Sequence, residues 1–467
     1  MSLEVPLISQ PDSSSLDVKE DSQADPAKPT YFGVQPTTKI GKYTSRKITL
    51  LQFWGIVAVV YTHAYNGYPR PLEPHNTYNP VNFVIAFEYF LAGGALRFAV
   101  PMFFTMSGFL FFVHKKYDKP DFNFGKRIRS RIKSILLPYL LWDIVAYLCV
   151  VLILLLIPKS QTLWPWFNFR VSPSTYAFPQ ILYTIRDTLI TPVPYQLWYL
   201  RDLFLLVLQT PLFFFLHRKM KCLWIVPAIV VIPWLCDLWP LKWFGLYILD
   251  LDGYLFFPIG SLLALYGIDI ERKISFKSTL AFFVLPWLAC NTAKAVIATF
   301  EDSTGPTKIL FLDIKVLLYK ISLPFGVLSV WFLYDHVVNF QNKRENVRRI
   351  VNGNLVEVSS ESYTATLLNV LTPYTLWIYC SHEPVMGYLL EIMQPFLGLC
   401  KLINPGSVEP SKAQKCIHVA NPAWFLLIYM VTPIIWICYL VFLGSLIKRC
   451  SPKAFALLTG GRVAKKK

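Results

Sequence analysis

The segment SILLPYLLWDIVAYLCVVLILLLI, residues 134–157, decides the fold class of this chain. Its only charged residue is Asp143. A helix that crosses the hydrocarbon core of a bilayer needs about 20 consecutive, mostly apolar residues. We therefore predict that this segment is a transmembrane helix.

Segments of the same kind recur on both sides of this one. The predicted spans are residues 48–66, 98–114, 134–157, 197–216, 222–240, 253–268, 279–299, 309–333, 366–392 and 423–447. The composition agrees, because 54% of the residues are hydrophobic and 16% are charged, whereas soluble domains carry about 25% charged residues. We predict an all-α fold, a polytopic membrane helical bundle with about ten transmembrane helices.

Lys and Arg are concentrated in alternate loops of this membrane region. Basic clusters precede the first span, fill every second loop after it, and end the chain at Lys465 to Lys467. Basic loops mark the cytoplasmic side of a membrane protein, so the N and C termini are both predicted to be cytoplasmic. These loops account for the net charge of +17, and we do not expect the protein to bind nucleic acid.

Three regions follow from this pattern. Residues 1–45, rich in Ser, Pro, Asp and Lys, are predicted to be a disordered cytosolic tail. Residues 46–450 form the membrane domain, and residues 451–467 form a basic cytosolic tail. The first region lacks the apolar core of a cleavable signal peptide, so the first span is expected to direct insertion. The sequence does not predict an oligomeric state.

The nine cysteines show neither a CxxC pair nor a zinc-binding spacing, so no metal site is predicted. Cys400 and Cys416 share one polar loop. The predicted topology places this loop on the outer side, where a disulfide can form. A bridge between these two residues and a pair of free thiols both stay open.

Ionisable residues inside the predicted spans are few. A charge in the middle of a bilayer costs about 3 kcal/mol or more unless it is paired or faces a cavity. These residues are His63, Asp143, Arg201, Asp202, Asp313, Lys315, Lys320, His382 and Glu383. Each charge is therefore either part of a functional site or neutralised by a partner within the bundle, and the sequence favours neither reading.

His63 lies near the outer end of the first span, and Gln52 lies near its cytosolic end. Eleven residues make almost three helical turns, so both side chains lie on one stripe, about 16 Å apart along the axis. An imidazole titrates near neutral pH and accepts a proton from an attacking hydroxyl. A long donor such as acyl-CoA would bridge these two levels. The alternative is that His63 is a structural hydrogen-bonding group.

Six segments together resemble a known family. LQFWGIVAVVYTHAY (residues 51–65) resembles the opening helix of the membrane acyltransferase-3 superfamily, which includes bacterial O-antigen and Nod-factor O-acetyltransferases. Its later motifs are resembled, in family order, by VPMFFTMSGFLFF (100–112), KRIRSRIKSILLPYLLW (126–142), QLWYLRDLFLL (196–206), GYLFFPIGSLLA (253–264) and LWIYCSHEPV (376–385). The resemblance covers most of residues 48–447. It implies a ten-helix acyltransferase domain that moves an acyl group, often acetyl, from a cytosolic donor to a hydroxyl, commonly on a carbohydrate.

One position departs from the family pattern. The opening helix of the family carries Arg, then ten intervening residues, then His, and here the position of the Arg is Gln52. Gln can hydrogen-bond a phosphate, but it brings no charge and cannot make the charged fork of Arg. The substitution leaves open altered donor handling, a different donor, or lost catalysis.

The resemblance assigns expected roles. His63 is the expected general base, and Asn66, Ser107 and Arg201 are expected to stabilise the oxyanion or orient the acceptor. His382 is a second candidate that would place the donor. The head of acetyl-CoA or another acyl-CoA is expected to meet Gln52, Arg46, Lys47, Arg127 and Arg131. The acceptor is expected to be a hydroxyl of a glycan or a lipid-linked molecule, and the protein's other partner is the bilayer.

Each role has a competing interpretation. Ser107 lies among small residues that favour tight helix packing, and His382 could instead bridge Glu383 or Tyr379 on a neighbouring turn. For the whole protein, a transporter and a catalytically inactive family member stay as alternatives. Solute flux without acyl transfer indicates the first, and donor binding without turnover indicates the second.

Overall fold

The computed structural model describes the residues that form the core of the bundle. These are residues 40–64, 80–113, 123–156, 192, 194–238, 242–243, 246–247, 250–300, 308–349, 370–383, 385–386, 400–403, 415–418 and 422–461. Residues 1–39 of the predicted N-terminal tail, the end of the basic tail from residue 462, and the candidate site residue Asn66 lie outside the described residues.

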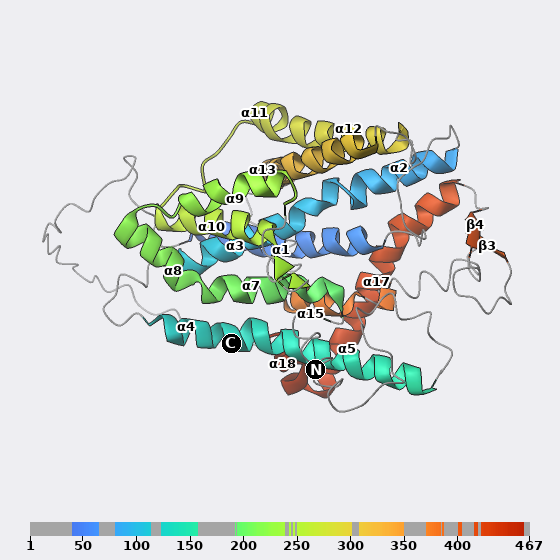
Figure 1. The fold of residues 1–467 in the computed structure, drawn as a ribbon, viewed down its shortest axis with the longest axis horizontal. Helices are drawn as coiled ribbons and strands as arrows, with labels where there is room; N and C mark the ends of the chain where they lie inside the picture. The colour runs from blue at the N-terminus through green and yellow to red at the C-terminus, as the bar shows by residue number, and fades with distance from the viewer. Residues whose placement is uncertain are drawn as a thin grey trace, which may run out of the picture.

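Almost all of the described elements are helices (Figure 1). In chain order they are α1 (Lys42–His63), α2 (Pro80–Ala92), η1 (Ala95–Phe98), α3 (Ala99–Phe112), α4 (Phe124–Arg131), η3 (Ile132–Leu136), α5 (Leu137–Leu156), η6 (Tyr195–Leu197), α7 (Trp198–Leu208), α8 (Thr210–Phe215), η7 (Leu216–Met220), α9 (Ile225–Leu235), α10 (Leu251–Leu265), α11 (Phe276–Thr279), η8 (Leu280–Val284), α12 (Leu285–Phe300), α13 (Lys308–Arg349), η10 (Thr372–Tyr374), α15 (Thr375–Ser381), α17 (Pro422–Cys450) and α18 (Pro452–Leu458).

Two short antiparallel hairpins accompany the helices. Strand β1 (Lys242–Trp243) pairs with β2 (Leu246–Tyr247), and β3 (Cys400–Ile403) pairs with β4 (Lys415–His418). In the second hairpin Cys400 lies opposite His418, and Cys416 lies opposite Leu402. The hairpin thus brings the two cysteine-bearing strands together, and whether Cys400 and Cys416 form a disulfide stays open.

Several helices are long and apolar enough to cross a membrane. Within the described residues, four stretches meet this criterion: Ala86–Phe112, Phe276–Thr299, Asp313–Val338 and Leu426–Cys450. A bent pair, Tyr195–Leu208 and Thr210–Met220, adds a fifth if it forms one span. Most of the long helices lie side by side, and α17 crosses them obliquely (Figure 1). The protein is therefore an integral multi-pass membrane protein.

The junction between α7 and α8 bends by 46°. Pro211 stands in the first turn of α8, and a proline has no N–H for the hydrogen bond to the preceding turn. The predicted span 197–216 is thus helical as expected, but it consists of two helices that meet at an angle.

Helix α2 was not among the predicted elements. Its sequence, PVNFVIAFEYFLA, has only 13 residues, which is fewer than the about 20 that mark a span. It continues into α3 through η1, and together they make the span Ala86–Phe112. Its Glu88 is fully buried, so this helix belongs to the bundle, and the observed span Ala86–Phe112 is longer than the predicted span 98–114.

Helices α3 and α10 come into close backbone contact at two glycines. A Cβ atom at Gly108 would collide with the carbonyl oxygen of Phe257, and one at Gly260 would collide with the carbonyl oxygen of Thr105. Small residues allow such contact between membrane helices. The packing role of Gly108 therefore has direct structural support.

The start of the predicted basic tail is folded against the bundle. Phe455 of α18 is fully buried and packs on the rings of Tyr374 and Trp377. The indole N–H of Trp142 donates to the carbonyl of Leu458 at 3.1 Å. The described part of residues 451–467 thus packs against α5 and α15, and the domain boundary near residue 450 stays a prediction.

Candidate active site

His63 is the last helical residue of α1. Its Nδ1 lies 2.7 Å from the hydroxyl oxygen of Tyr195, and the two rings meet edge to face with centroids 5.2 Å apart. Tyr195 is the first residue of η6, the short turn that leads into α7. The candidate base therefore meets a phenol from a distant part of the chain.

His382 stands beside His63. It follows α15 as the C-cap, and the centroids of the two imidazoles lie 5.3 Å apart. The structure thus brings together the two histidines that the sequence marked as site candidates.

The hydrogen bonds of His382 define which nitrogen carries the proton. Nδ1 lies 2.8 Å from the carbonyl oxygen of Tyr379 and 3.2 Å from that of Ile378. Because a carbonyl oxygen only accepts hydrogen bonds, we assign the proton of the neutral ring to Nδ1. Nε2 then presents its lone pair, and this buried atom has no hydrogen-bond partner among the described residues. Of the two structural partners that the sequence offered for His382, Tyr379 and Glu383, the hydrogen bond goes to Tyr379, through its backbone carbonyl.

A set of backbone contacts fixes η6 against α15. The side-chain amide of Gln196 donates to the carbonyl of Glu383 at 2.6 Å and to that of Cys380 at 3.3 Å. The hydroxyl of Tyr379 donates in return to the carbonyl of Gln196. On the other side, the indole N–H of Trp436 donates to the carbonyl of His382 at 3.2 Å. These bonds fix η6, which carries Tyr195, against the end of α15, which carries His382.

Ser107 is linked to this group through an aromatic side chain. Its Oγ lies 3.3 Å from the hydroxyl of Tyr199, whose ring lies 6.0 Å from that of Tyr379. Tyr379 in turn packs 6.2 Å from the ring of His382. Ser107 is therefore a neighbour of the histidine pair through Tyr199 and Tyr379.

Arg201 is engaged by an acidic partner. Its guanidinium forms a 2.7 Å ion pair with Asp202, and Asp202 also accepts the backbone N–H of Asp250 at 2.9 Å. Lys320 is paired in a similar way, 3.1 Å from Asp237 and 3.8 Å from Asp252. The sequence did not decide whether Arg201 and Lys320 have neutralising partners within the bundle, and the structure shows that they do.

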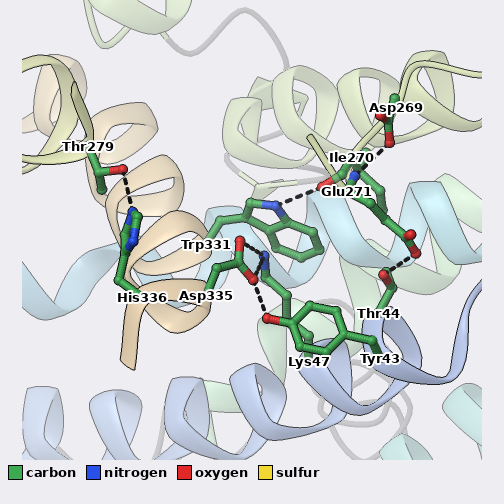
Figure 2. Close-up of polar contacts among 10 residues, drawn as sticks. All are labelled: Tyr43, Thr44, Lys47, Asp269, Ile270, Glu271, Thr279, Trp331, Asp335 and His336. Carbon is green, nitrogen blue, oxygen red and sulfur yellow. Dashed lines mark hydrogen bonds and ion pairs between the residues drawn. The ribbon is translucent and has the colours of Figure 1, made fainter. Parts of the chain in front are cut away.

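Lys47, expected to meet the donor's phosphates, lies in a polar cluster between α1 and α13 (Figure 2). Its ammonium is 2.8 Å from the carboxylate of Asp335 and sits 4.0 Å above the ring centre of Trp331. Asp335 also accepts the hydroxyl of Tyr43 at 2.6 Å. With 2% of its side chain exposed, Lys47 reaches a phosphate only if this ion pair is exchanged.

The same cluster ties in the turn after α10. Thr44 bonds to Glu271, and the indole N–H of Trp331 donates to the carbonyl of Ile270 at 3.2 Å (Figure 2). The cluster thus joins α1, the turn after α10 and α13. It lies at the end of the bundle that the predicted topology places on the cytosolic side.

Arg127 closes the C-terminal end of α3. Its guanidinium donates to the carbonyls of Leu110 and Phe111 and lies 4.5 Å over the ring of Phe111. Burial, with a further contribution from nearby Arg131, lowers the pKa of Arg127 to about 10, so it is still charged at neutral pH. A cation at a helix C-terminus is favourable, and Arg127 therefore has a structural role besides any contact with the donor.

The remaining donor-side residues are more open. Arg46 is exposed on α1, and Gln52 and Arg131 are half-buried. The sequence did not single out Tyr195 or Gln196 as site residues. Gln196 is the first residue of the motif QLWYLRD, and this position was one indication that it contributes to the site. Tyr195 precedes the predicted span, and no sequence pattern indicated it.

Comparison with known proteins identifies the class. The family model for an acyltransferase domain matches residues 46–443. The chain therefore belongs to the acyltransferase-3 family and is a membrane acyltransferase.

One curated relative adds context. The chain is 25% identical, over 428 residues, to the succinoglycan biosynthesis protein ExoH of Rhizobium meliloti (strain 1021). The match covers 91% of this chain and 94% of the relative. No solved structure matches the chain.

Proposed function

We propose that the protein is an O-acyltransferase that moves an acyl group, in the first instance acetyl, from acyl-CoA to a hydroxyl of a carbohydrate or a lipid-linked acceptor. The observation that carries this proposal is the meeting of His63 with Tyr195 and His382. The relative's name, which refers to succinoglycan, a polysaccharide, supports a carbohydrate acceptor.

The proposed reaction uses His63 as its general base. The imidazole takes the proton of the acceptor hydroxyl, and the oxygen attacks the thioester carbonyl. A C–O bond forms, the C–S bond breaks, and the thiolate leaves and regains a proton as the CoA thiol. A positioned base of this kind contributes typically about 10²–10⁴-fold. Ser107, Arg201 and Asn66 are proposed to orient the acceptor or stabilise the oxyanion.

Helix α1 provides a path for a donor that enters from the cytosol. Its 22 residues span about 33 Å at 1.5 Å per residue, and this length supports the proposal that Lys42 and His63 lie near opposite faces of the bilayer. We propose ten transmembrane helices with both termini in the cytoplasm. Phosphates of the donor would then meet Arg46, Gln52 and the other basic residues, and His382 would help to place the thioester.

The experiment uses the purified protein with radiolabelled acetyl-CoA and a panel of glycans. We expect a labelled ester, and we expect His63→Ala to lower its formation by about 10²–10⁴-fold. His336→Ala is the matched control, because His336 bonds to Thr279 away from the site and should leave transfer intact. Ester formation by His63→Ala at the unaltered rate would remove His63 from the mechanism.

An inactive family member is a second candidate because of Gln52. Such a protein would bind acyl-CoA and form no ester with any acceptor. A transporter has less support, since Lys320 is neutralised by Asp237 and Asp252 rather than left to line a path.

A further inference from the structure

We infer that Tyr195 is a positioning residue that accepts a hydrogen bond from Nδ1–H of His63 and so presents the lone pair of Nε2 to the acceptor hydroxyl. This inference rests on the proposed function, which requires His63 to be a base. It adds a residue that the sequence motifs did not mark.

The end of α1 leaves the imidazole in need of such a partner. His63 is the final residue of the helix, and the next residue, Ala64, closes it by donating to the carbonyl of Val60 at 2.9 Å. The 2.7 Å contact with the Tyr195 hydroxyl therefore fixes the direction in which the imidazole points.

Tyr195 itself is held by its chain neighbours. Gln196 is buried and bonds to the carbonyls on both sides of His382, those of Cys380 and Glu383. Leu197 is fully buried and donates its N–H to the carbonyl of Pro194 at 2.9 Å. The phenol thus projects from a rigid turn, and its hydroxyl is pre-positioned before substrate arrives.

The chemistry of a neutral imidazole selects the direction of the bond. Only one ring nitrogen carries hydrogen, and the hydrogen bond at one nitrogen determines what the other can do. If Nδ1–H donates to the phenol oxygen, Nε2 is the basic atom. The same oxygen then stabilises the imidazolium that forms when Nε2 takes the proton.

Within the part of the chain that the structure describes, three titratable or charged groups face His63 from the elements packed around it. They are Tyr195 of η6, His382 beside α15, and Arg97 of η1, whose charge acts on the imidazole. His382 and Arg97 bring no acceptor to Nδ1, because Nε2 of His382 has no hydrogen-bond partner among the described residues and a guanidinium only donates. Tyr195 is therefore the group suited to hold this proton.

The test is Tyr195→Phe, which removes one oxygen and keeps the ring. We expect kcat for acetyl transfer to fall about 10- to 100-fold, less than the about 10²–10⁴-fold of losing the base itself, with KM for acetyl-CoA within about twofold. The acidic limb of the kcat/KM pH profile should move to lower pH, because the imidazolium loses a stabilising acceptor.

Tyr61→Phe is the matched control. Tyr61 lies on the same helix, two residues before His63, and donates to the carbonyl of Met430 at 2.8 Å. We expect it to leave kcat and the pH profile unchanged. We also expect Tyr195→Phe to cause no further loss in a His63→Ala background, since a residue that acts through His63 has no effect without it.

Two results would overturn the inference alone: full kcat with an unshifted pH profile in Tyr195→Phe, or an additional loss of the same size in the His63→Ala background. Absence of acetyl transfer by the unaltered protein, with every acceptor tried, would overturn the proposed function and this inference with it. The two failures are therefore distinguishable.

Discussion

The imidazole of His63 is held at the end of α1 by groups that come from remote parts of the chain. Tyr195 reaches it from η6 and His382 from the end of α15. His382 is in turn fixed by its bond to the carbonyl of Tyr379, and the neighbour of Tyr195, Gln196, donates to the carbonyl of Glu383. At the scale of single residues, the candidate site is therefore ordered without a bound substrate, which suits the proposed proton transfer.

Gln52 is the residue whose identity departs from the family pattern, and its substitution provides a direct test. We expect Gln52→Arg to lower KM for acetyl-CoA about 3- to 10-fold, because a guanidinium fork binds phosphate oxygens through charged, paired hydrogen bonds. The measurement is KM at low and high salt, and the gain should shrink at high salt. Gln52→Lys is the control, since it adds the same charge without the fork and should gain less. An unchanged KM in both variants would place the donor's phosphates elsewhere.

At the scale of elements, the contact between α3 and α10 shows how two helices of the bundle pack closely together. Thr105 and Gly108 on one helix face Phe257 and Gly260 on the other, backbone against backbone. The sequence marked these segments as apolar and of roughly the right length. It did not mark α2 or the bend before α8, because a 13-residue helix falls below the length of a span and a proline only sometimes bends a helix in a bundle.

We predict that Gly260→Ala destabilises the protein by about 1–3 kcal/mol, the usual cost of overpacking a core. The added methyl would meet the backbone of Thr105, which cannot move aside without shifting α3. The midpoint of thermal unfolding in detergent reports the effect. Gly253→Ala is the control, because its nearest neighbour is the flexible end of Leu206, 3.0 Å away, and its midpoint should change less. Equal midpoints for the two variants would contradict the packing argument.

At the scale of the whole molecule, the proposed reaction requires the multi-pass bundle to join a cytosolic donor to an acceptor near the other face. The polar cluster around Lys47 lies at one end of α1, and the histidine pair lies at its other end. This separation suits a long donor whose charged head and reactive thioester are far apart. It also makes the orientation of the chain in the membrane a condition for the proposed reaction.

Accessibility labelling checks this orientation. In a background without reactive native cysteines, we expect Ser45→Cys and Lys453→Cys to react with an impermeant reagent only from the cytosolic side. Trp424→Cys, at the start of α17, should react only from the opposite side. All three positions are exposed, so a difference in labelling reports the side of the membrane. Labelling of Ser45→Cys and Lys453→Cys from opposite sides would contradict an even number of spans.

The sequence by itself determined that this chain is a helical membrane protein, because each segment that crosses a bilayer must be long and apolar enough on its own. It also marked His63 and His382, since an ionisable group in an apolar span stands out without knowledge of its neighbours. Only the tertiary structure decided that these two histidines meet, that Tyr195 holds one of them and that Lys47 is paired with Asp335. Such contacts depend on the packing of helices that are far apart in the chain, and no local pattern of residues encodes that packing.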